Sequence, residues 1–148
     1  MIACSSSKFK VRINATFNSD KKWSGPPKNA TWPRIGLPQA RPLIVHEIPD
    51  VRVNGHRTKR LPGNVSVSFK GVDGASLLIL LDEDGICASG GSACNTGESR
   101  ISYVIKELGV PEDYAAGTVR MTLSRDTGRS DIDAAVESLK RNIDRLRD

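Results

Sequence analysis

The sequence predicts an α/β (or α+β) layer, a short sheet covered by helices, over residues 46–148. Two observations support this fold class. In two stretches apolar and polar side chains alternate, the period of a strand with one buried face. In two others apolar side chains recur every three or four residues, the period of an amphipathic helix. Because strand and helix signals alternate along the chain, the helices are expected to cover the sheet.

The first half of this region carries mostly turn and strand signals. Its expected elements are turns at Asn54-Gly55 and Pro62-Gly63, a strand through Val65, Val67 and Phe69, a turn from Gly71 to Gly74, a buried helix from Ala75 to Leu81, and a short strand from Ile86 to Ala88.

The second half is richer in helical spacing. Its expected elements are a helix with the apolar stripe Ile101, Val104, Ile105 and Leu108, a strand from Thr118 to Ser124, and a helix with the stripe Ile132, Val136, Leu139, Ile143 and Leu146. Gly109 is placed to end the first helix as its C-cap. Ser130 with Asp133 resembles a capping box that would start the second.

Residues 1–45 differ from the rest. They hold eight Lys or Arg and one acid, a net charge of +7, whereas residues 46–148 have a net charge of −2. Five prolines and weak periodicity predict a poorly ordered leader. A basic arm of this kind can bind nucleic acid. No RNA-binding signature or amphipathic period organises the charges here, so we expect no nucleic-acid partner.

The composition narrows the class of protein. Hydrophobic residues make up 38% and charged residues 26%, as in ordinary globular proteins. The longest apolar run, Leu77 to Leu81, is far too short to span a membrane, and no signal peptide is recognisable. Three cysteines, an odd number, do not suggest a disulfide framework. These features predict a cytoplasmic protein without a membrane partner.

Cys94 is the candidate nucleophile. It follows the small-residue loop Ser89-Gly90-Gly91-Ser92 and precedes a predicted helix, whose N-terminal N–H groups favour a thiolate. The alternative is an inert thiol that packs as a small hydrophobe.

Arg120 is the candidate binding residue. It lies on a predicted strand, on the face opposite Val119 and Met121. A guanidinium on a rigid strand can grip a carboxylate with two parallel hydrogen bonds. The alternative is a surface charge in water.

The remaining cysteines and histidines are expected to be structural or solvated. Cys87 falls in a predicted core strand, and Cys4 in the leader. His46 and His56 lack further ligands at metal-binding spacing, so no metal site is expected.

The run from Cys87 through Ser89-Gly90-Gly91-Ser92 to Cys94, with the following helix from Ser102 to Gly109, resembles the active-cysteine loop of cysteine desulfurases. The branch is the one that serves iron–sulfur cluster assembly and nitrogen fixation. The segments from Asn54 to Phe69, Gly74 to Leu78 and Thr118 to Ser124 also match in order, so the resemblance covers about residues 46–147.

The resemblance implies the small C-terminal domain of a fold-type I pyridoxal-phosphate-dependent transferase. Such enzymes take sulfur from L-cysteine, leave L-alanine, and work as homodimers. Cys94 would carry the sulfur as a persulfide to an iron–sulfur scaffold and could contact a nascent cluster transiently. Arg120 would bind the substrate carboxylate.

Residues 1–45 depart from this family. They contain nothing like its cofactor lysine and phosphate-binding residues, so we expect this chain alone to bind no pyridoxal phosphate and to be inactive. Three interpretations stay open: a fragment of a desulfurase, a non-catalytic domain that binds a scaffold or sulfur-trafficking partner, and a basic binding module.

Overall fold

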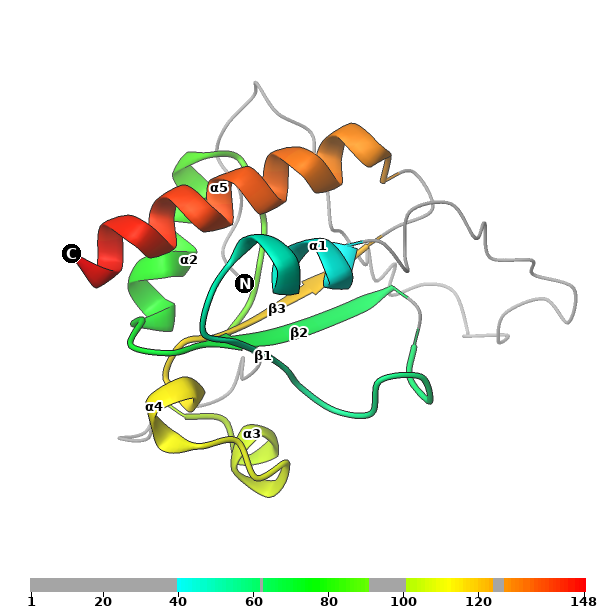
Figure 1. The fold of residues 1–148 in the computed structure, drawn as a ribbon, viewed down its shortest axis with the longest axis vertical. Helices are drawn as coiled ribbons and strands as arrows, with labels where there is room; N and C mark the ends of the chain where they lie inside the picture. Colours follow the sequence, from blue (N-terminus) through cyan, green and yellow to red (C-terminus); the bar gives the residue numbers. More distant parts are fainter. Residues whose placement is uncertain (1–39, 62, 91–100, 124–126) are drawn as a thin grey trace, which may run out of the picture.

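The computed structural model describes residues 40–61, 63–90, 101–123 and 127–148 (Figure 1). The elements are, in chain order, α1 (Ala40–Glu47), β1 (Val51–Val53), β2 (Asn64–Phe69), α2 (Gly74–Glu83), α3 (Tyr103–Glu107), α4 (Glu112–Ala115), β3 (Thr118–Thr122) and α5 (Arg129–Arg147).

The three strands form an antiparallel sheet in the order β1-β2-β3. On one face the buried side chains Val65 and Val67 of β2 lie opposite Met121 and Val119 of β3. Helices α1, α2 and α5 lie on one side of the sheet, while α3 and α4 lie on the other (Figure 1). The predicted fold class, a short sheet covered by helices, is confirmed.

Helix α5 follows the predicted apolar stripe, and Ile132, Val136, Leu139 and Ile143 are buried. Its predicted start is wrong. The helix begins at Arg129, and the N3 carboxylate of Asp131 accepts a hydrogen bond from the Gly128 N–H at 2.8 Å. Asp133 instead pairs with Arg129 at 2.8 Å, one helical turn away. Asp131 and Asp133 are both spaced to cap the start of this helix, and sequence spacing alone pointed to Asp133 rather than Asp131.

Helix α1 was not predicted, and the boundary at residue 46 falls inside it. Ala40, Ile44 and Ile48 are buried in the main core, so residues 40–45 belong to the fold. Pro42 is the third residue of α1, in the first turn, where a backbone N–H would have no helical partner. A proline is therefore tolerated there. Residues 1–39 lie outside the described residues, and their lack of order stays a prediction.

The segment from Ile86 to Ala88 does not form the predicted strand. Ile86 is a single bridge residue, and one residue after the predicted segment Ser89 and Arg120 form an isolated bridge with two backbone hydrogen bonds of 3.0 and 2.7 Å. Cys87 is half-buried, so it packs at the edge of the core.

Helix α3 is shorter than its stripe suggested. Ile105 is buried, whereas Val104 is 61% and Leu108 43% exposed. Its predicted end is confirmed. Gly109 has φ +62°, its N–H donates to Lys106 O, and the Val110 N–H donates to Ile105 O. These two bonds form a Schellman motif, which needs a left-handed residue at this position.

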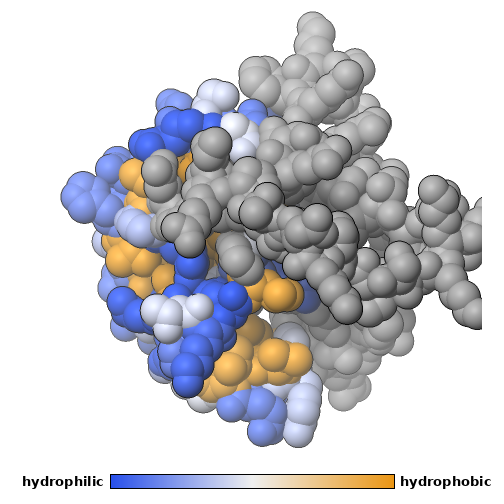
Figure 2. Space-filling model, turned by 90° about the vertical axis from the view of Figure 1, so that its right-hand side faces the viewer, coloured by the Kyte–Doolittle hydropathy of each residue, from blue (hydrophilic) through white to orange (hydrophobic). Residues whose placement is uncertain are grey.

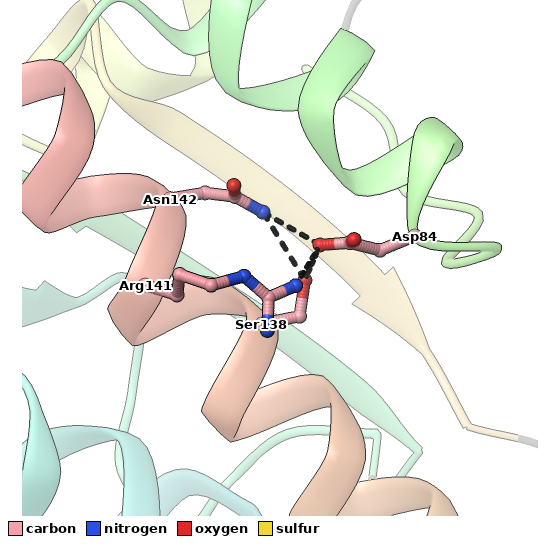
Figure 3. A network of polar contacts seen from close by, with 4 residues as sticks. All are labelled: Asp84, Ser138, Arg141 and Asn142. Atoms are coloured by element: carbon pink, nitrogen blue, oxygen red, sulfur yellow. Dashed lines mark hydrogen bonds and ion pairs between the residues drawn. The ribbon is translucent and has the colours of Figure 1, made fainter.

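A polar cluster joins the end of α2 to α5 (Figure 3). Oδ2 of Asp84 accepts hydrogen bonds from the Ser138 hydroxyl, from Arg141 at 2.6 Å, and from Asn142 Nδ2 at 2.8 Å. The bond from Ser138 is the largest of the effects that lower the pKa of Asp84; those from Asn142 and Arg141 add to it. Among the described residues, no helix is both long and apolar enough to cross a membrane.

Candidate functional site

The second face of the sheet is polar. Because side chains alternate along a strand, Ser66 and Ser68 of β2 share this face with Arg120 and Thr118 of β3, their partners in the register. A cavity of about 260 Å³ opens over it. It is lined by Asn54, Gly55, His56, Arg60, Asn64, Ser66, Val104, Ile105, Leu108, Thr118 and Arg120.

A chain of buried hydrogen bonds runs along this face. The Thr118 hydroxyl donates to the Ala115 carbonyl oxygen at 2.8 Å, and Ser68 Oγ lies 2.7 Å from Thr118 Oγ1. Since a carbonyl oxygen only accepts, the Ser68 hydroxyl must donate to Thr118. Asn54 Nδ2 then donates to Ser68 Oγ at 2.8 Å and to Ser66 Oγ at 3.3 Å. This order fixes the orientation of the Asn54 amide.

Asn54 is only 3% exposed, and its Oδ1 is a buried acceptor that has no hydrogen-bond partner among the described residues. Unpaired buried acceptors are uncommon, because leaving one unsatisfied costs about 1–3 kcal/mol. In the wall of the cavity, the Oδ1 atom of Asn54 therefore makes no hydrogen bond to the described residues, whereas Nδ2 of the same amide makes two.

Arg120 lies on the face opposite Val119 and Met121, as the alternation predicted, and its side chain is exposed. Within the described part of the chain, no side chain or carbonyl oxygen pairs with its guanidinium, and no Asp or Glu lines the cavity. An arginine held on a strand with all five N–H donors available is suited to bind an oxyanion.

Arg60 lines the same cavity and was not singled out by the sequence. Its two terminal nitrogens donate to the carbonyl oxygens of Asn54 (3.0 Å) and Asn64 (3.1 Å). It thereby clamps together the two ends of the loop between β1 and β2. Burial, and next the charge of Arg41, lower the pKa of Arg60.

The opposite wall of the cavity is apolar and comes from α3, through Val104, Ile105 and Leu108. Figure 2 shows apolar surface beside hydrophilic surface on the lower part of the molecule, the level at which Figure 1 places α3. The cavity thus combines cationic and apolar walls, which suits a small anion with an apolar part.

Cys94 lies outside the described residues, so its role stays a prediction. The residues on either side of that segment are placed. Ser89 is bonded to the backbone of Arg120, and Ile101 leads into α3, which lines the cavity. The described residues before that segment therefore lie beside Arg120, and those after it lead into the apolar wall.

The two histidines of the described fold contact only nearby groups. His46 is exposed, with Nδ1 3.1 Å from Glu47 Oε1. His56 Nδ1 accepts hydrogen bonds from the backbone N–H groups of Thr58 (3.1 Å) and Lys59 (2.9 Å). Among the described residues, no three His, Cys, Asp or Glu side chains gather as a metal site would require.

The described residues that line the cavity do not fit pyridoxal phosphate, because no lysine, the residue to which this cofactor attaches, is among them. Away from the cavity lining, Lys70 and Lys140 pair with Asp113 (3.4 Å) and Glu47 (3.6 Å).

The sequence model of the family "Aminotransferase class-V" matches residues 39–135. The chain is 40% identical over 104 residues to a cysteine desulfurase of Klebsiella pneumoniae, covering 70% of this chain and 26% of that protein. It is 41% identical over 101 residues to the cysteine desulfurase IscS of Methanosarcina thermophila, covering 68% and 25%. The chain thus spans about a quarter of the length of these curated relatives.

Solved structures share the fold. A NifS-like protein from Rickettsia africae superposes with a TM-score of 0.59 at 24% identity, covering 73% of this chain and 28% of that one. A second NifS-like protein gives 0.60 at 21% identity, covering 74% and 28%. At these identities the likeness shows the fold alone.

Proposed function

Because the chain belongs to the aminotransferase class-V family, we propose that it is the C-terminal part of a cysteine desulfurase, which takes sulfur from L-cysteine and leaves L-alanine. The observation that carries the proposal is the guanidinium of Arg120, which has no partner among the described residues, in a cavity whose described lining holds no Asp or Glu; Ser89, bonded to its backbone, precedes Cys94 by five residues.

Arg120 binds the carboxylate of the substrate. Strand β3 fixes its backbone through the pairs with Ser66 and Ser89, so only the rotamers of the exposed side chain remain to be ordered on binding. A carboxylate accepts two parallel N–H bonds from a guanidinium, which fixes its orientation as well as its position.

Cys94 accepts the sulfur. In the sequence it stands five residues after Ser89, whose backbone is hydrogen-bonded to that of Arg120. In the net reaction the C–S bond of L-cysteine breaks and its electron pair stays on the carbon, which takes up a proton. The sulfur forms an S–S bond with Cys94, so two thiols give one persulfide and one alanine.

The lysine and pyridoxal phosphate come from sequence outside this chain. The assembled enzyme is a homodimer in the cytoplasm that passes its sulfur to an iron–sulfur scaffold. The second candidate is a non-catalytic domain that binds such a scaffold. The exposure of the apolar side chain of Val104 on α3 favours that candidate.

A hybrid enzyme tests the proposal. Residues 39–148 replace the matching segment of the Klebsiella pneumoniae cysteine desulfurase, and alanine formed from L-cysteine is measured. The aldimine absorbance reports whether the hybrid holds its cofactor. We expect turnover, and expect Cys94→Ser to abolish it while the absorbance is kept.

The control variant is Arg57→Gln, which removes one exposed charge from the loop between β1 and β2 without touching the cavity lining. Arg120→Gln should raise the KM for L-cysteine at least tenfold, and Arg57→Gln should not. A cofactor-loaded hybrid that forms no alanine would favour the non-catalytic candidate.

A further inference from the structure

The loop between β1 and β2, residues 54–63, concentrates positive charge. It holds Arg57, Lys59 and Arg60 and no Asp or Glu. Arg60 in this loop is only partly exposed and lies close enough to Arg41 for the two charges to repel. Within the described part of the chain, neither arginine has an acidic partner. Two neighbouring, partly buried cations without an anion are unfavourable, and an anion would relieve the cost.

The hydrogen bonds of Arg60 leave most of its donors unused. The bonds to Asn54 O and Asn64 O take two of the five N–H groups. The Nε–H is buried and has no partner in the described parts of the chain, and one N–H remains on each terminal nitrogen. The clamp on the loop therefore holds the guanidinium in a fixed place and still leaves three donors for a further acceptor.

We propose that Arg60 is a second cationic contact in the cavity of Arg120, so that a bound oxyanion, of the carboxylate class, lies between two guanidinium groups. Both arginines line one cavity of about 260 Å³, a volume near the lower limit for small-molecule sites. Val104 and Leu108 form the apolar wall against which the short hydrocarbon part of such a ligand packs. This inference rests on the proposed function for the role of Arg120 and adds Arg60 to it.

The position of Arg60 has a consequence for the loop. The guanidinium of Arg60 donates to the carbonyl oxygens of both Asn54 and Asn64. An anion that accepts a hydrogen bond from Arg60 therefore changes the surroundings of both ends of the loop. Ligand binding should therefore change the environment of the loop as well as that of Arg120.

The test uses the full chain and propionate as the probe, added at constant ionic strength with sodium chloride. The arginine Nε–H signals are followed by ¹H–¹⁵N NMR. We expect the Arg60 and Arg120 signals to shift with one common Kd, while the signal of Arg145, which is exposed on α5 and outside the cavity lining, stays in place. Inorganic phosphate, titrated in the same way, shows whether the site prefers a carboxylate; tighter binding of phosphate would overturn the stated ligand class.

Variants separate this inference from the proposed function. Arg60→Gln should raise the Kd for propionate at least about fivefold, the effect of losing a charge-assisted hydrogen bond, whereas the matched Arg57→Gln should change it less than twofold. If Arg120→Gln removes binding and Arg60→Gln does not weaken it, the role of Arg60 is refuted and that of Arg120 stands. If neither variant affects binding, both fail.

Because Arg60→Gln also removes the clamp, the unsubstituted chain gives an independent answer. An Arg60 Nε–H signal that does not move while the Arg120 signal saturates with propionate would overturn the inference without any substitution.

Discussion

Replacing Asp84 by alanine should destabilise the fold by about 3 kcal/mol at pH 7. The carboxylate accepts hydrogen bonds from Ser138 and Asn142, which are 4% and 5% exposed, and each bond to a charged acceptor is worth about 1.5 kcal/mol. Arg141 should add little, because its side chain is 57% exposed and its ion pair is screened by water. The variant removes the acceptor of the buried Ser138 hydroxyl and the nearer of the two acceptors of Asn142 Nδ2, which keeps only its 3.2 Å bond to Ser138 Oγ (Figure 3).

The pH dependence follows from the lowered pKa of Asp84, whose first cause is the hydrogen bond from Ser138. A carboxyl with a lower pKa in the folded state stabilises the fold above its unfolded value, near 3.8, and this stability is lost as pH falls through the folded value. The difference between the original chain and Asp84→Ala should therefore be constant at neutral pH and shrink in the acid range.

Urea unfolding followed by far-UV circular dichroism, at several pH values, measures this difference. Glu83→Gln is the matched control, because it removes an exposed charge from the end of α2 outside the cluster. A loss below about 0.5 kcal/mol at pH 7, the usual range for surface substitutions, would refute the argument. So would a difference that persists unchanged well below pH 3.8.

The purified chain should show no aldimine absorbance with pyridoxal phosphate and should release no sulfide from L-cysteine. A yellow protein that turns over L-cysteine would contradict the need for a lysine from outside this chain. Cys94 should react with iodoacetamide faster than Cys87, which is half-buried, and peptide mapping that finds Cys87 modified first would contradict this. Gly117→Ala should destabilise the fold by more than about 2 kcal/mol, because the new methyl group would lie 2.2 Å from the carbonyl oxygen of Phe69. Gly90→Ala is the control, because its methyl group would meet a flexible side chain at 3.6 Å. Equal urea midpoints for the two variants would refute the packing argument.

Patterns among residues close together in the sequence predicted the strands and helix ends that depend on local backbone and side-chain geometry. The alternation around Val67 and Val119 gave both long strands and the face on which Arg120 lies, because side-chain direction alternates along a strand. Gly109 marked the end of α3, because the Schellman motif requires its positive φ. Helix α1 was missed because Pro42 reads as a helix breaker unless its place in the first turn is known.

The candidate site depends on contacts that sequence periodicity does not report. Ser68 and Thr118 are fifty residues apart in sequence, and their hydrogen bond exists only once β2 and β3 pair. Asn54 carried only a turn signal, although its side chain is buried in that network. No sequence pattern indicated that Arg60 belongs to the site, because its hydrogen-bond partners are backbone carbonyl oxygens, which every residue has.

Peptide mass spectrometry of the hybrid desulfurase after a single turnover with L-cysteine tests the central claim most directly. We expect one added sulfur atom on the peptide that contains Cys94, and we expect a thiol reductant to remove it. In the Arg120→Gln variant, at the same low substrate concentration, we expect no added sulfur on that peptide. Alanine formation with the added sulfur on Cys87, or on no cysteine of this chain, would contradict the account.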